Sequence, residues 1–305
     1  TVQHQATMLW NSRLKRIRLS GGIDFKAEQM DSLTMGIHRR QLGSLFFNLN
    51  LPLKRTGIDA GLRTTLMDGQ EPNLVIYSGL YYQITRLIKL KFSTGKSFRL
   101  PSFTELYYQS PSNRGNRELR NESNLSYEIA LTVLRGKHSF DMSVYFRDQR
   151  DSIDWVKYPD LSGNYSPYWE AVNIRKNDIA GIEFIHNIVL SNTYLNYGFE
   201  RTFEVNRQDG FLSKYGLRFP SFAFKCNLSA PMPFVKKLRF IGNYTYKRMN
   251  SSNEKGHFLD LKFNLTLSVF KISLKINNLF NQVIEEIPGV KIPGRWAYLQ
   301  FSYHP

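Results

Sequence analysis

Few side chains in this sequence could carry catalytic chemistry. Asp151 and Asp154 stand close together and Glu285 is followed by Glu286, as a general acid and a general base could be. Both pairs are expected in exposed loops, where acids more often decorate a hairpin or bind a cation than catalyse. The six histidines show no metal-ligand spacing; they include His38, His138, His186 and His257. We therefore expect no enzyme active site, no metal site and no cofactor.

Cysteine content and net charge limit the partners further. Cys226 is the single cysteine, so an internal disulfide and a cysteine-based zinc site are excluded. Lys and Arg number 41 against 25 Asp and Glu, which gives a formal charge of +16. These cations do not cluster in an arm or a helix; many alternate with apolar residues, and others occupy short turns. We therefore expect no nucleic-acid partner.

The elements that would position any site are β-strands, because apolar and polar residues alternate with a period of two. The alternation is clear over residues 139–147, 259–267 and 271–277, where one face is apolar and the other polar or charged. No run of about 18 apolar residues occurs, so the sequence excludes a membrane-spanning helix but not spanning strands. No helical segment, linker or repeat is evident.

Short and long connections between strands alternate along the chain, as they do in outer-membrane barrels, which have short periplasmic turns and long external loops. The long connections are 99–122, 152–175, 206–216 and 278–293. The alternation predicts about fifteen strands, at 3–11, 15–29, 43–52, 56–67, 73–83, 86–98, 123–134, 138–151, 176–188, 193–204, 217–228, 236–247, 256–267, 269–277 and 294–303. The expected fold is all-β, an antiparallel transmembrane β-barrel forming one domain over residues 1–305.

Two sequence motifs resemble those of one family of outer-membrane barrels. Residues 95–108 read Gly-Lys-Ser-Phe-Arg-Leu-Pro-Ser-Phe-Thr-Glu-Leu-Tyr-Tyr, and residues 115–122 read Gly-Asn-Arg-Glu-Leu-Arg-Asn-Glu. Together they resemble the mid-barrel segment of TonB-dependent receptors, in which Phe-Arg-(Ala/Leu)-Pro leads to Glu-Leu-Tyr and returns through Gly-Asn-Pro-x-Leu-Lys-Pro-Glu. Arg117 and Asn121 replace the two prolines, so this loop is expected to be less rigid than in the family.

The second motif lies near the C-terminus. Residues 276–281 read Ile-Asn-Asn-Leu-Phe-Asn and residues 292–296 read Ile-Pro-Gly-Arg-Trp, followed by alternating apolar residues to Tyr303. This resembles the penultimate and final strands of the same receptors. The family usually ends on an aromatic residue, whereas this chain continues past Tyr303 to His304 and Pro305.

The resemblance implies the C-terminal part, about fifteen strands, of a 22-stranded receptor barrel in the bacterial outer membrane, with the plug domain absent. It implies uptake of a scarce nutrient such as cobalamin or a ferric siderophore. The implied partners are that small-molecule nutrient, TonB through a missing N-terminal region, and outer-membrane lipid with lipopolysaccharide. The loop sequences 106–116 and 153–156 look more like the cobalamin-receptor branch than the catecholate branch.

Ligand recognition in such a receptor would rest on the long external loops, where aromatic rings and polar tips are available. Tyr and Trp also form the girdles of barrels at membrane interfaces, which is the competing role for each of these residues. The candidates are Tyr107, Tyr108, Asn113, Arg114, Trp155, Tyr158, Tyr165, Tyr168 and Trp169.

Other readings of the same pattern stay open at this point. A passive porin-like channel, a surface adhesin or a degenerate receptor fragment would share the alternating strands. A soluble antiparallel β protein with a basic ligand face would share them too, because one apolar face per strand also suits a water-soluble sheet.

Overall fold

The computed structural model describes residues 1–69, 71–207, 210–215, 219–235, 237–250, 254–287 and 290–303. Contacts divide the chain into two units. Unit 1 comprises residues 1–130, 145–180 and 204–216, and unit 2 comprises residues 131–144, 181–203 and 217–305. Strands β9 to β12 contribute residues to both units.

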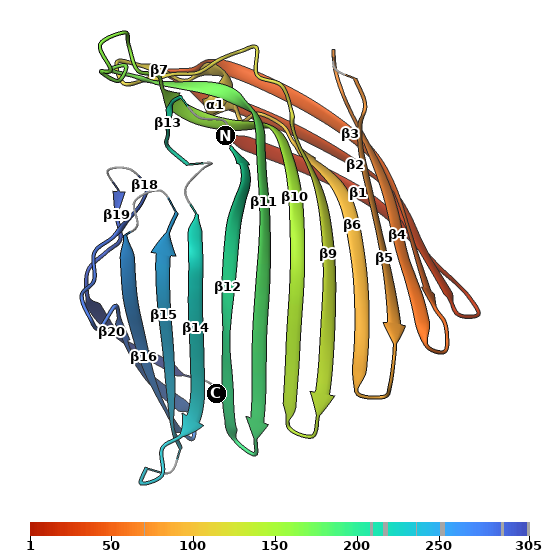
Figure 1. Ribbon diagram of the computed structural model, residues 1–305, viewed down its shortest axis with the longest axis vertical. Coiled ribbons are helices and arrows are strands. Elements are labelled where there is room, and N and C mark those ends of the chain that lie inside the picture. Colours follow the sequence, from red (N-terminus) through yellow and green to blue (C-terminus); the bar gives the residue numbers. More distant parts are fainter. Residues whose placement is uncertain are drawn as a thin grey trace. The chain divides into compact units, whose positions relative to one another are not determined.

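Unit 1 begins with six long antiparallel strands, each paired with the next along the chain (Figure 1). Its short elements lie in the connections that follow. The elements are β1 (Val2–Leu14), β2 (Ile17–Ser32), β3 (Gly36–Pro52), β4 (Thr56–Met67), β5 (Asn73–Gln83), β6 (Ile88–Arg99), α1 (Phe103–Tyr107), β7 (Gln109–Ser110), β8 (Asn113–Arg114) and β13 (Leu212–Ser213).

The strands that contribute to both units are β9 (Glu122–Arg135), β10 (His138–Lys157), β11 (Trp169–Leu190) and β12 (Thr193–Arg207). Unit 2 continues with consecutive antiparallel pairs from β14 to β17, and β17 then pairs with β20. Its further elements are β14 (Pro220–Pro231), β15 (Leu238–Met249), β16 (Lys255–Leu267), β17 (Phe270–Asn277), β18 (Glu285–Ile287), β19 (Val290–Lys291) and β20 (Trp296–Tyr303).

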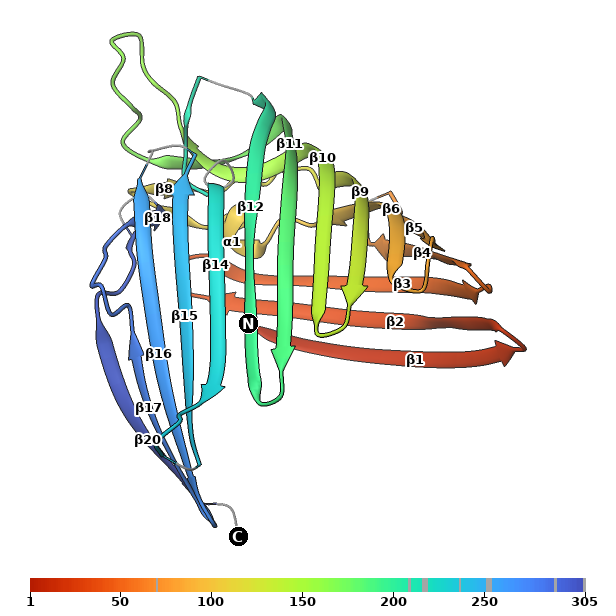
Figure 2. The same cartoon turned by 60° about the horizontal axis from the view of Figure 1, so that its bottom comes forward.

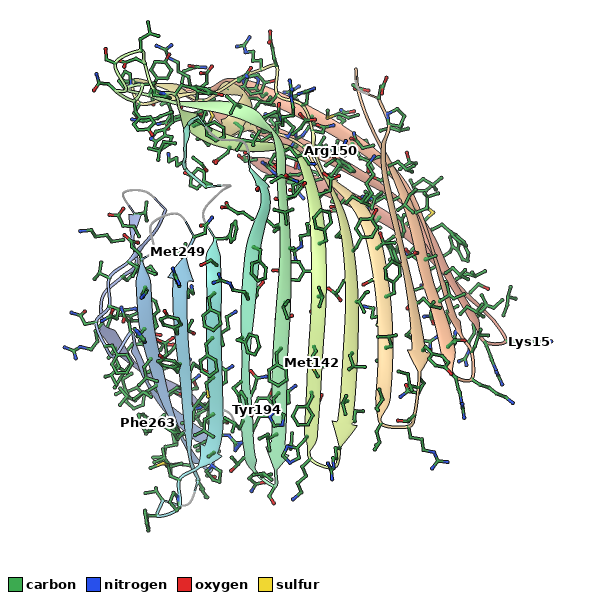
Figure 3. All side chains as sticks on the ribbon, in the orientation of Figure 1. Lys15, Met142, Arg150, Tyr194, Met249 and Phe263 are labelled. Atoms are coloured by element: carbon green, nitrogen blue, oxygen red, sulfur yellow. The ribbon has the colours of Figure 1, made fainter. Side chains whose placement is uncertain are left out.

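Two-residue turns join β1 to β2, β9 to β10, β11 to β12 and β16 to β17. Lys15, Gly136, Ser191 and Ser268 each adopt a positive φ in such a turn, between 39° and 60°. Hairpins with two-residue loops need this left-handed backbone because it matches the twist of the flanking strands. Lys15 lies at the tip of the β1–β2 hairpin (Figure 3). In unit 1 the β1–β2 turn lies at the strand ends away from α1 and β7 (Figures 1 and 2).

The pleat gives each strand one apolar and one polar face. In unit 2, Phe240 of β15 lies opposite Phe263 of β16 with ring centroids 5.5 Å apart. The next pair along the strands, Ile241 and Lys262, belongs to the other face. Leu299 and Phe301 on the apolar face of β20 are 54% and 70% exposed. Lipid must therefore cover this face to keep it out of contact with water.

The C-terminal motif folds into an asparagine-centred turn in unit 2. Asn278 adopts a positive φ of 49°, which Asn tolerates better than most residues. Its Nδ2 donates to the carbonyls of Gln282 at 2.7 Å and Pro293 at 2.9 Å, and its backbone N–H donates to Asp260 Oδ1 at 2.8 Å. The Arg295 N–H donates to Asn281 Oδ1 at 2.8 Å. The motif therefore joins the end of β17 to the start of β20.

Fifteen described strands have eight or more residues, as the alternation predicts, but three expectations are wrong. The absence of helix is corrected by α1. The expected gap 30–42 is mostly strand, because β2 and β3 pair as far as Ser32 and Gly36, with the Glu28–Arg40 ion pair at 2.6 Å between the two strands. The loop 152–175 shrinks to 158–168, because β10 runs to Lys157 and β11 begins at Trp169. No helix among the described residues is long and apolar enough to cross a bilayer.

Candidate functional site

Arg99 anchors the loop that follows β6. Its guanidinium donates to both carboxylate oxygens of Glu105 at 2.9 and 3.0 Å, and to both of Glu122 at 2.7 and 2.8 Å. Such forked guanidinium–carboxylate bonds are stronger and more directional than neutral hydrogen bonds. Glu122 also accepts the Ile153 N–H at 2.6 Å. Arg99 and these two glutamates therefore connect β6, α1, β9 and β10.

Helix α1 begins with a capping box. The Glu105 N–H donates to Ser102 Oγ at 3.2 Å, and the Ser102 N–H donates to Glu105 Oε2 at 2.7 Å. This reciprocal arrangement satisfies two of the backbone donors that a helix start leaves open. Ser-x-x-Glu was the sequence feature that could have indicated this five-residue helix.

We expect the anchor to weaken in acid. Burial alone would raise the pKa of Glu105, but hydrogen bonds from Arg99 and from the Ser102 backbone and hydroxyl outweigh it and hold the pKa of Glu105 below its ordinary value. A lowered carboxyl pKa contributes stability above the unfolded value of about 4.3 and loses it as pH falls through the folded value. Hydrogen exchange of residues 103–108 should therefore accelerate below about pH 4 relative to E105Q, whose exchange should change less with pH. Equal pH dependence in both proteins would contradict this.

A small hydrophobic core lies beneath the loop. Leu119, Ile153, Trp155 and Ala171 form it, and each of them is less than 9% exposed. Leu106, Tyr108 and Trp169 are partly buried and pack against it. The apolar residues therefore come from the α1 segment, from the segment between β8 and β9, from β10 and from β11, and their packing holds these elements together within unit 1.

A buried carboxylate holds β13 to β10. Asp154 is 1% exposed and accepts the N–H of Trp155 at 2.8 Å and of Tyr215 at 3.0 Å, and it also accepts the Ser213 hydroxyl. The Lys214 N–H donates to the Trp155 carbonyl at 2.9 Å. The expectation that Asp154 lies in an exposed loop is therefore wrong, because its strand is covered on both faces.

The two loop segments that carry the predicted ligand residues meet at β8. Asn113 and Arg114 of β8 pair in parallel with Trp169 and Glu170, and the Trp169 N–H donates to Ser112 O at 2.9 Å. The Asn113 amide donates to the Ser110 and Ser112 hydroxyls at 3.2 and 2.9 Å. A parallel pair needs a long crossover, so no local pattern in the sequence indicates this contact.

Cations stack on the aromatic rings of this cluster. The Arg114 guanidinium carbon lies 3.5 Å from the centre of the Tyr168 ring. Lys157 and Lys214 lie 5.2 and 5.5 Å from the Trp169 ring. Such contacts contribute about 0.5–1 kcal/mol each at exposed sites. They leave positive charge at the loop surface.

Tyr158 and Tyr165 lie in the connection after β10. Pro159 and Tyr165 form a β-bridge, and the Ser166 N–H donates to the Tyr158 carbonyl at 2.9 Å. The Tyr158 ring meets Phe211 edge-on at 6.0 Å. Burial, with a smaller contribution from the nearby Glu170 carboxylate, raises the pKa of the Tyr158 hydroxyl, so this group stays protonated and able to donate a hydrogen bond.

The structure brings the nine predicted residues into one region of unit 1, but in different settings. Trp155 is buried in a strand rather than exposed in a loop, so its expected availability to a ligand is corrected. Trp169 begins a strand, and Tyr107 ends α1 with its ring stacked on His38 at 3.5 Å. Tyr158 and Tyr165 are 44% and 53% exposed. Contact of the other eight with a ligand stays a prediction.

Sequence reasoning missed a pocket of about 380 Å³ beside these residues. Three arginines line it with aromatic and apolar side chains. Arg40 lies 5.0 Å from the Phe103 ring and Arg117 lies 5.5 Å from the Tyr107 ring. Its lining is Arg39, Arg40, Gln41, Met67, Asp68, Pro101, Phe103, Leu106, Tyr107, Arg117 and Leu119. These residues are too far apart in the sequence for spacing to group them.

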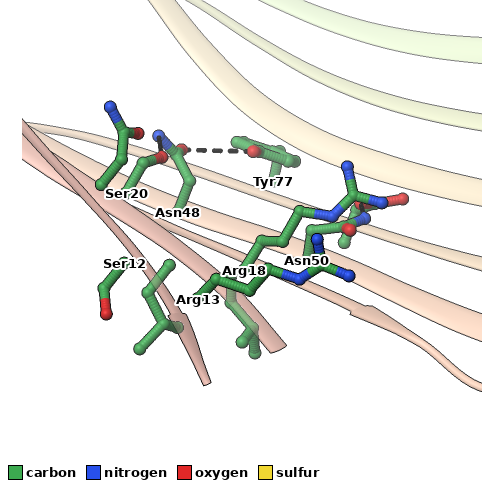
Figure 4. A pocket seen from close by; sticks show the side chains of 11 residues that line it. Ser12, Arg13, Arg18, Ser20, Asn48, Asn50 and Tyr77 are labelled. Atoms are coloured by element: carbon green, nitrogen blue, oxygen red, sulfur yellow. Dashed lines mark hydrogen bonds between the residues drawn. The ribbon is translucent and has the colours of Figure 1, made fainter. Parts of the chain in front are cut away.

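A second pocket of unit 1, of about 440 Å³, lies near the β1–β2 turn and offers a comparison (Figure 4). Arg13 and Arg18 line it together with Asn48, Asn50 and Tyr77. The Tyr77 hydroxyl donates to Asn48 Oδ1 at 3.2 Å. Like the first pocket, this one is lined by arginines, but there are two rather than three. It lies at the tight-turn end of the strands, away from α1.

Two histidines that appear scattered in the sequence meet in unit 2. His138 Nδ1 lies 3.0 Å from His186 Nε2, and His186 Nδ1 lies 2.9 Å from the Tyr197 hydroxyl. The Phe140 ring stacks on His186 at 4.0 Å. No group of three or more His, Cys, Asp or Glu suited to a metal occurs within the described ranges.

Residues 5–279 match the sequence model described as "TonB dependent receptor-like, beta-barrel". The chain belongs to this family. The expected fold class, an antiparallel transmembrane β-barrel, is thereby confirmed, as is the location in the bacterial outer membrane. Members of this family are transport receptors rather than enzymes. In this receptor barrel the tight turns face the periplasm and the α1 loop faces outward.

Curated relatives of the receptor include the vitamin B12 transporter BtuB of Photobacterium profundum, which is 25% identical over 171 residues. That match covers 56% of this chain and 27% of the relative. BtuB of Vibrio vulnificus strain YJ016 is 34% identical over 91 residues, 30% of this chain and 14% of the relative. The match thus spans about a quarter or less of these relatives.

Solved structures with a similar fold include siderophore and iron receptors. The siderophore receptor PirA of Pseudomonas aeruginosa has a TM-score of 0.75 at 14% identity, covering 98% of this chain and 54% of that one. The FrpB iron transporter of Neisseria meningitidis has a TM-score of 0.73 at 14% identity, covering 99% of this chain and 54% of that one. The chain therefore spans about half the length of these receptors.

Proposed function

We propose that this chain is the C-terminal part, residues 1–305, of the barrel domain of a TonB-dependent importer. It takes up a scarce nutrient, a cobalamin or a ferric siderophore, which the outward loops bind. The named relatives transport vitamin B12, and similar structures are receptors for siderophores or iron. Energy would come through TonB, acting on a part of the receptor outside this chain.

The observation that carries the proposal is the meeting of the two outward loop segments over a hydrophobic core. Arg99 and Asp154 fix the backbone on both sides of it, so the exposed rings and cations above it are held in place. A binding surface of ordered aromatic and charged side chains loses less conformational entropy on binding. The eight residues named from the sequence other than Trp155, together with the three-arginine pocket, are the proposed contacts.

The arginine pocket favours an anionic ligand. Arg39, Arg40 and Arg117 line it against a single lining carboxylate, Asp68, although Glu28 also pairs with Arg40. Phe103 and Tyr107 add flat rings that suit a catechol or corrin edge. An anionic ferric catecholate would therefore gain more from this pocket than a cobalamin would.

We expect the double variant R39Q/R117Q to bind ferric enterobactin at least about tenfold more weakly, a loss of about 1.4 kcal/mol. Cyanocobalamin binding should change less than about twofold, because attraction to the arginine charges contributes little to it. The measurement is equilibrium binding of each ligand to the full-length receptor in detergent. The matched control is R13Q/R18Q, which removes two arginines from the pocket at the periplasmic end.

Equal losses in the two double variants would contradict a role for the outward pocket. If the receptor binds neither ligand nor a panel of other ferric siderophores and corrinoids, the importer function itself fails.

The second candidate function, a passive porin-like barrel or a degenerate receptor, then predicts either unselective entry of solutes into liposomes or no entry at all. The exposed apolar face of the barrel supports lipid and lipopolysaccharide as further partners.

A further inference from the structure

The histidine pair of unit 2 lies where two tight turns meet. His138 is the first residue of β10, directly after the turn from β9, and His186 lies on β11 four residues before its end at Leu190. The Val189 N–H donates to the Lys137 carbonyl at 3.0 Å, which joins the β9–β10 and β11–β12 hairpins at this point. Tight turns of such barrels face the periplasm, so the pair lies at the periplasmic end of the barrel wall.

The Tyr197 hydroxyl orients the His186 ring. It lies 2.9 Å from His186 Nδ1, and the Phe140 ring stacks on His186 with centroids 4.0 Å apart. An Nδ1–H group that donates to the hydroxyl oxygen leaves Nε2 with a free lone pair. Nε2 is the atom that faces His138 Nδ1 at 3.0 Å. His186 therefore has the arrangement of a metal-binding histidine, whose second ring nitrogen is held by an outer partner.

The separation of the two nitrogens fits a shared metal ion. Imidazole nitrogens bind zinc at about 2.0–2.1 Å, so two of them on one ion lie about 2.8–3.4 Å apart when the angle at the ion is about 90–109°. The 3.0 Å between His138 and His186 lies inside that range. Binding requires the half-buried His138 ring to turn and to carry its proton on Nε2, so that both lone pairs meet at the ion. The distance between the strands need not change.

The type of ligand atom selects the metal. No third His, Cys, Asp or Glu joins the pair in the described part of the chain, so water fills the remaining positions of the ion. Imidazole suits copper, nickel and zinc, and among these divalent ions affinity is highest for Cu²⁺. Ca²⁺ and Mg²⁺ prefer oxygen ligands. The pair is therefore suited to a transition metal.

We propose that His138 and His186 bind one divalent transition-metal ion, Cu²⁺ most tightly, and that Tyr197 positions His186 for it. The ion replaces the hydrogen bond between the two rings as the link between β10 and β11. It reaches the site from the periplasm. The outward loops take no part in this site, so its loss leaves nutrient binding unchanged.

The test is titration of the full-length receptor, without a histidine tag and in detergent, with Cu²⁺ alone. Electron paramagnetic resonance reports both the bound ion and its nitrogen ligands. H138Q and H186Q should each bind Cu²⁺ at least about tenfold more weakly, and each should lose one nitrogen ligand from the spectrum. Y197F should bind about tenfold more weakly with both nitrogens kept, because outer partners of a metal ligand contribute about 10–100-fold.

The matched control is H257Q. His257 Nδ1 lies 2.8 Å from the Tyr244 hydroxyl, so His257 has the same tyrosine contact as His186. Its ring neighbours are Tyr244 and Tyr246, and no second imidazole contacts it among the described residues. Cu²⁺ affinity in H257Q should change less than about twofold.

Three outcomes would overturn the proposal. The first is unchanged Cu²⁺ affinity in H138Q and H186Q that still show the heat-modifiable gel mobility of a folded barrel. The second is an equal loss of affinity in H257Q, which would indicate that copper binds single histidines of the barrel wall. The third is a nitrogen-ligand spectrum that is the same in the wild type and in H138Q.

Discussion

Replacing Asp154 with alanine is expected to release β13 from β10. The change leaves the N–H groups of Trp155 and Tyr215 and the Ser213 hydroxyl without their carboxylate acceptor. Hydrogen bonds to a charged group contribute about 1.5–3 kcal/mol, so local opening should become easier by about 3 kcal/mol, roughly 100-fold. Amide exchange of residues 211–215 measures this directly.

The matched control is D151N, three positions earlier on the same strand. Asp151 forms an exposed pair with Arg120, which is 70% exposed, and asparagine tolerates the positive φ of 54° at this position. A surface pair of this kind contributes about 0–1 kcal/mol. If D151N accelerates exchange in 211–215 as much as D154A does, the carboxylate of Asp154 does not hold β13.

Replacing Trp155 with alanine is expected to leave a cavity in the hydrophobic core beneath the loops. Trp155 is 7% exposed and packs with Ile153, Leu119 and Ala171. Loss of a buried aromatic ring costs about 3–5 kcal/mol, because the transfer free energy and a cavity term add. Thermal unfolding should show the loss, and affinity for the nutrient should fall as well, although Trp155 itself does not reach the loop surface.

The control for this change is W10A, which removes the same side chain from a position on β1 that is 47% exposed. Its effect on unfolding should be well below that of W155A, and it should not change nutrient affinity. Unchanged nutrient affinity in W155A would mean that the core does not position the binding loops.

The sequence predicts the strands well because a barrel strand has one lipid face and one polar face for most of its length. Phe263 and Lys262 display this alternation as clearly in the sequence as on β16. Beyond the membrane the rule fails, because residues 153–156 are buried on both faces and no longer alternate. That is why β10 was expected to end at residue 151 and Trp155 was assigned to a loop.

The site was predictable only as a set of candidates. Tyr158, Tyr165 and Tyr168 fall in a connecting segment that the sequence does indicate. The parallel contact of β8 with Trp169 and the arginine pocket depend on residues dozens of positions apart, and no local pattern encodes them.

The Arg99 anchor has a consequence for how such receptors diversify. Glu105 and Glu122 are held by one guanidinium, so the segment between them leaves and returns at a fixed point. The entropy of closing a flexible loop grows only with the logarithm of its length, about 0.6 kcal/mol for each doubling. A longer or shorter segment between Glu105 and Glu122 therefore changes the closure entropy little, and its main cost is the loss of the contacts that Leu119 and β8 make. Evolution can exchange this loop, and the ligand it recognises, without rebuilding the strands that display it.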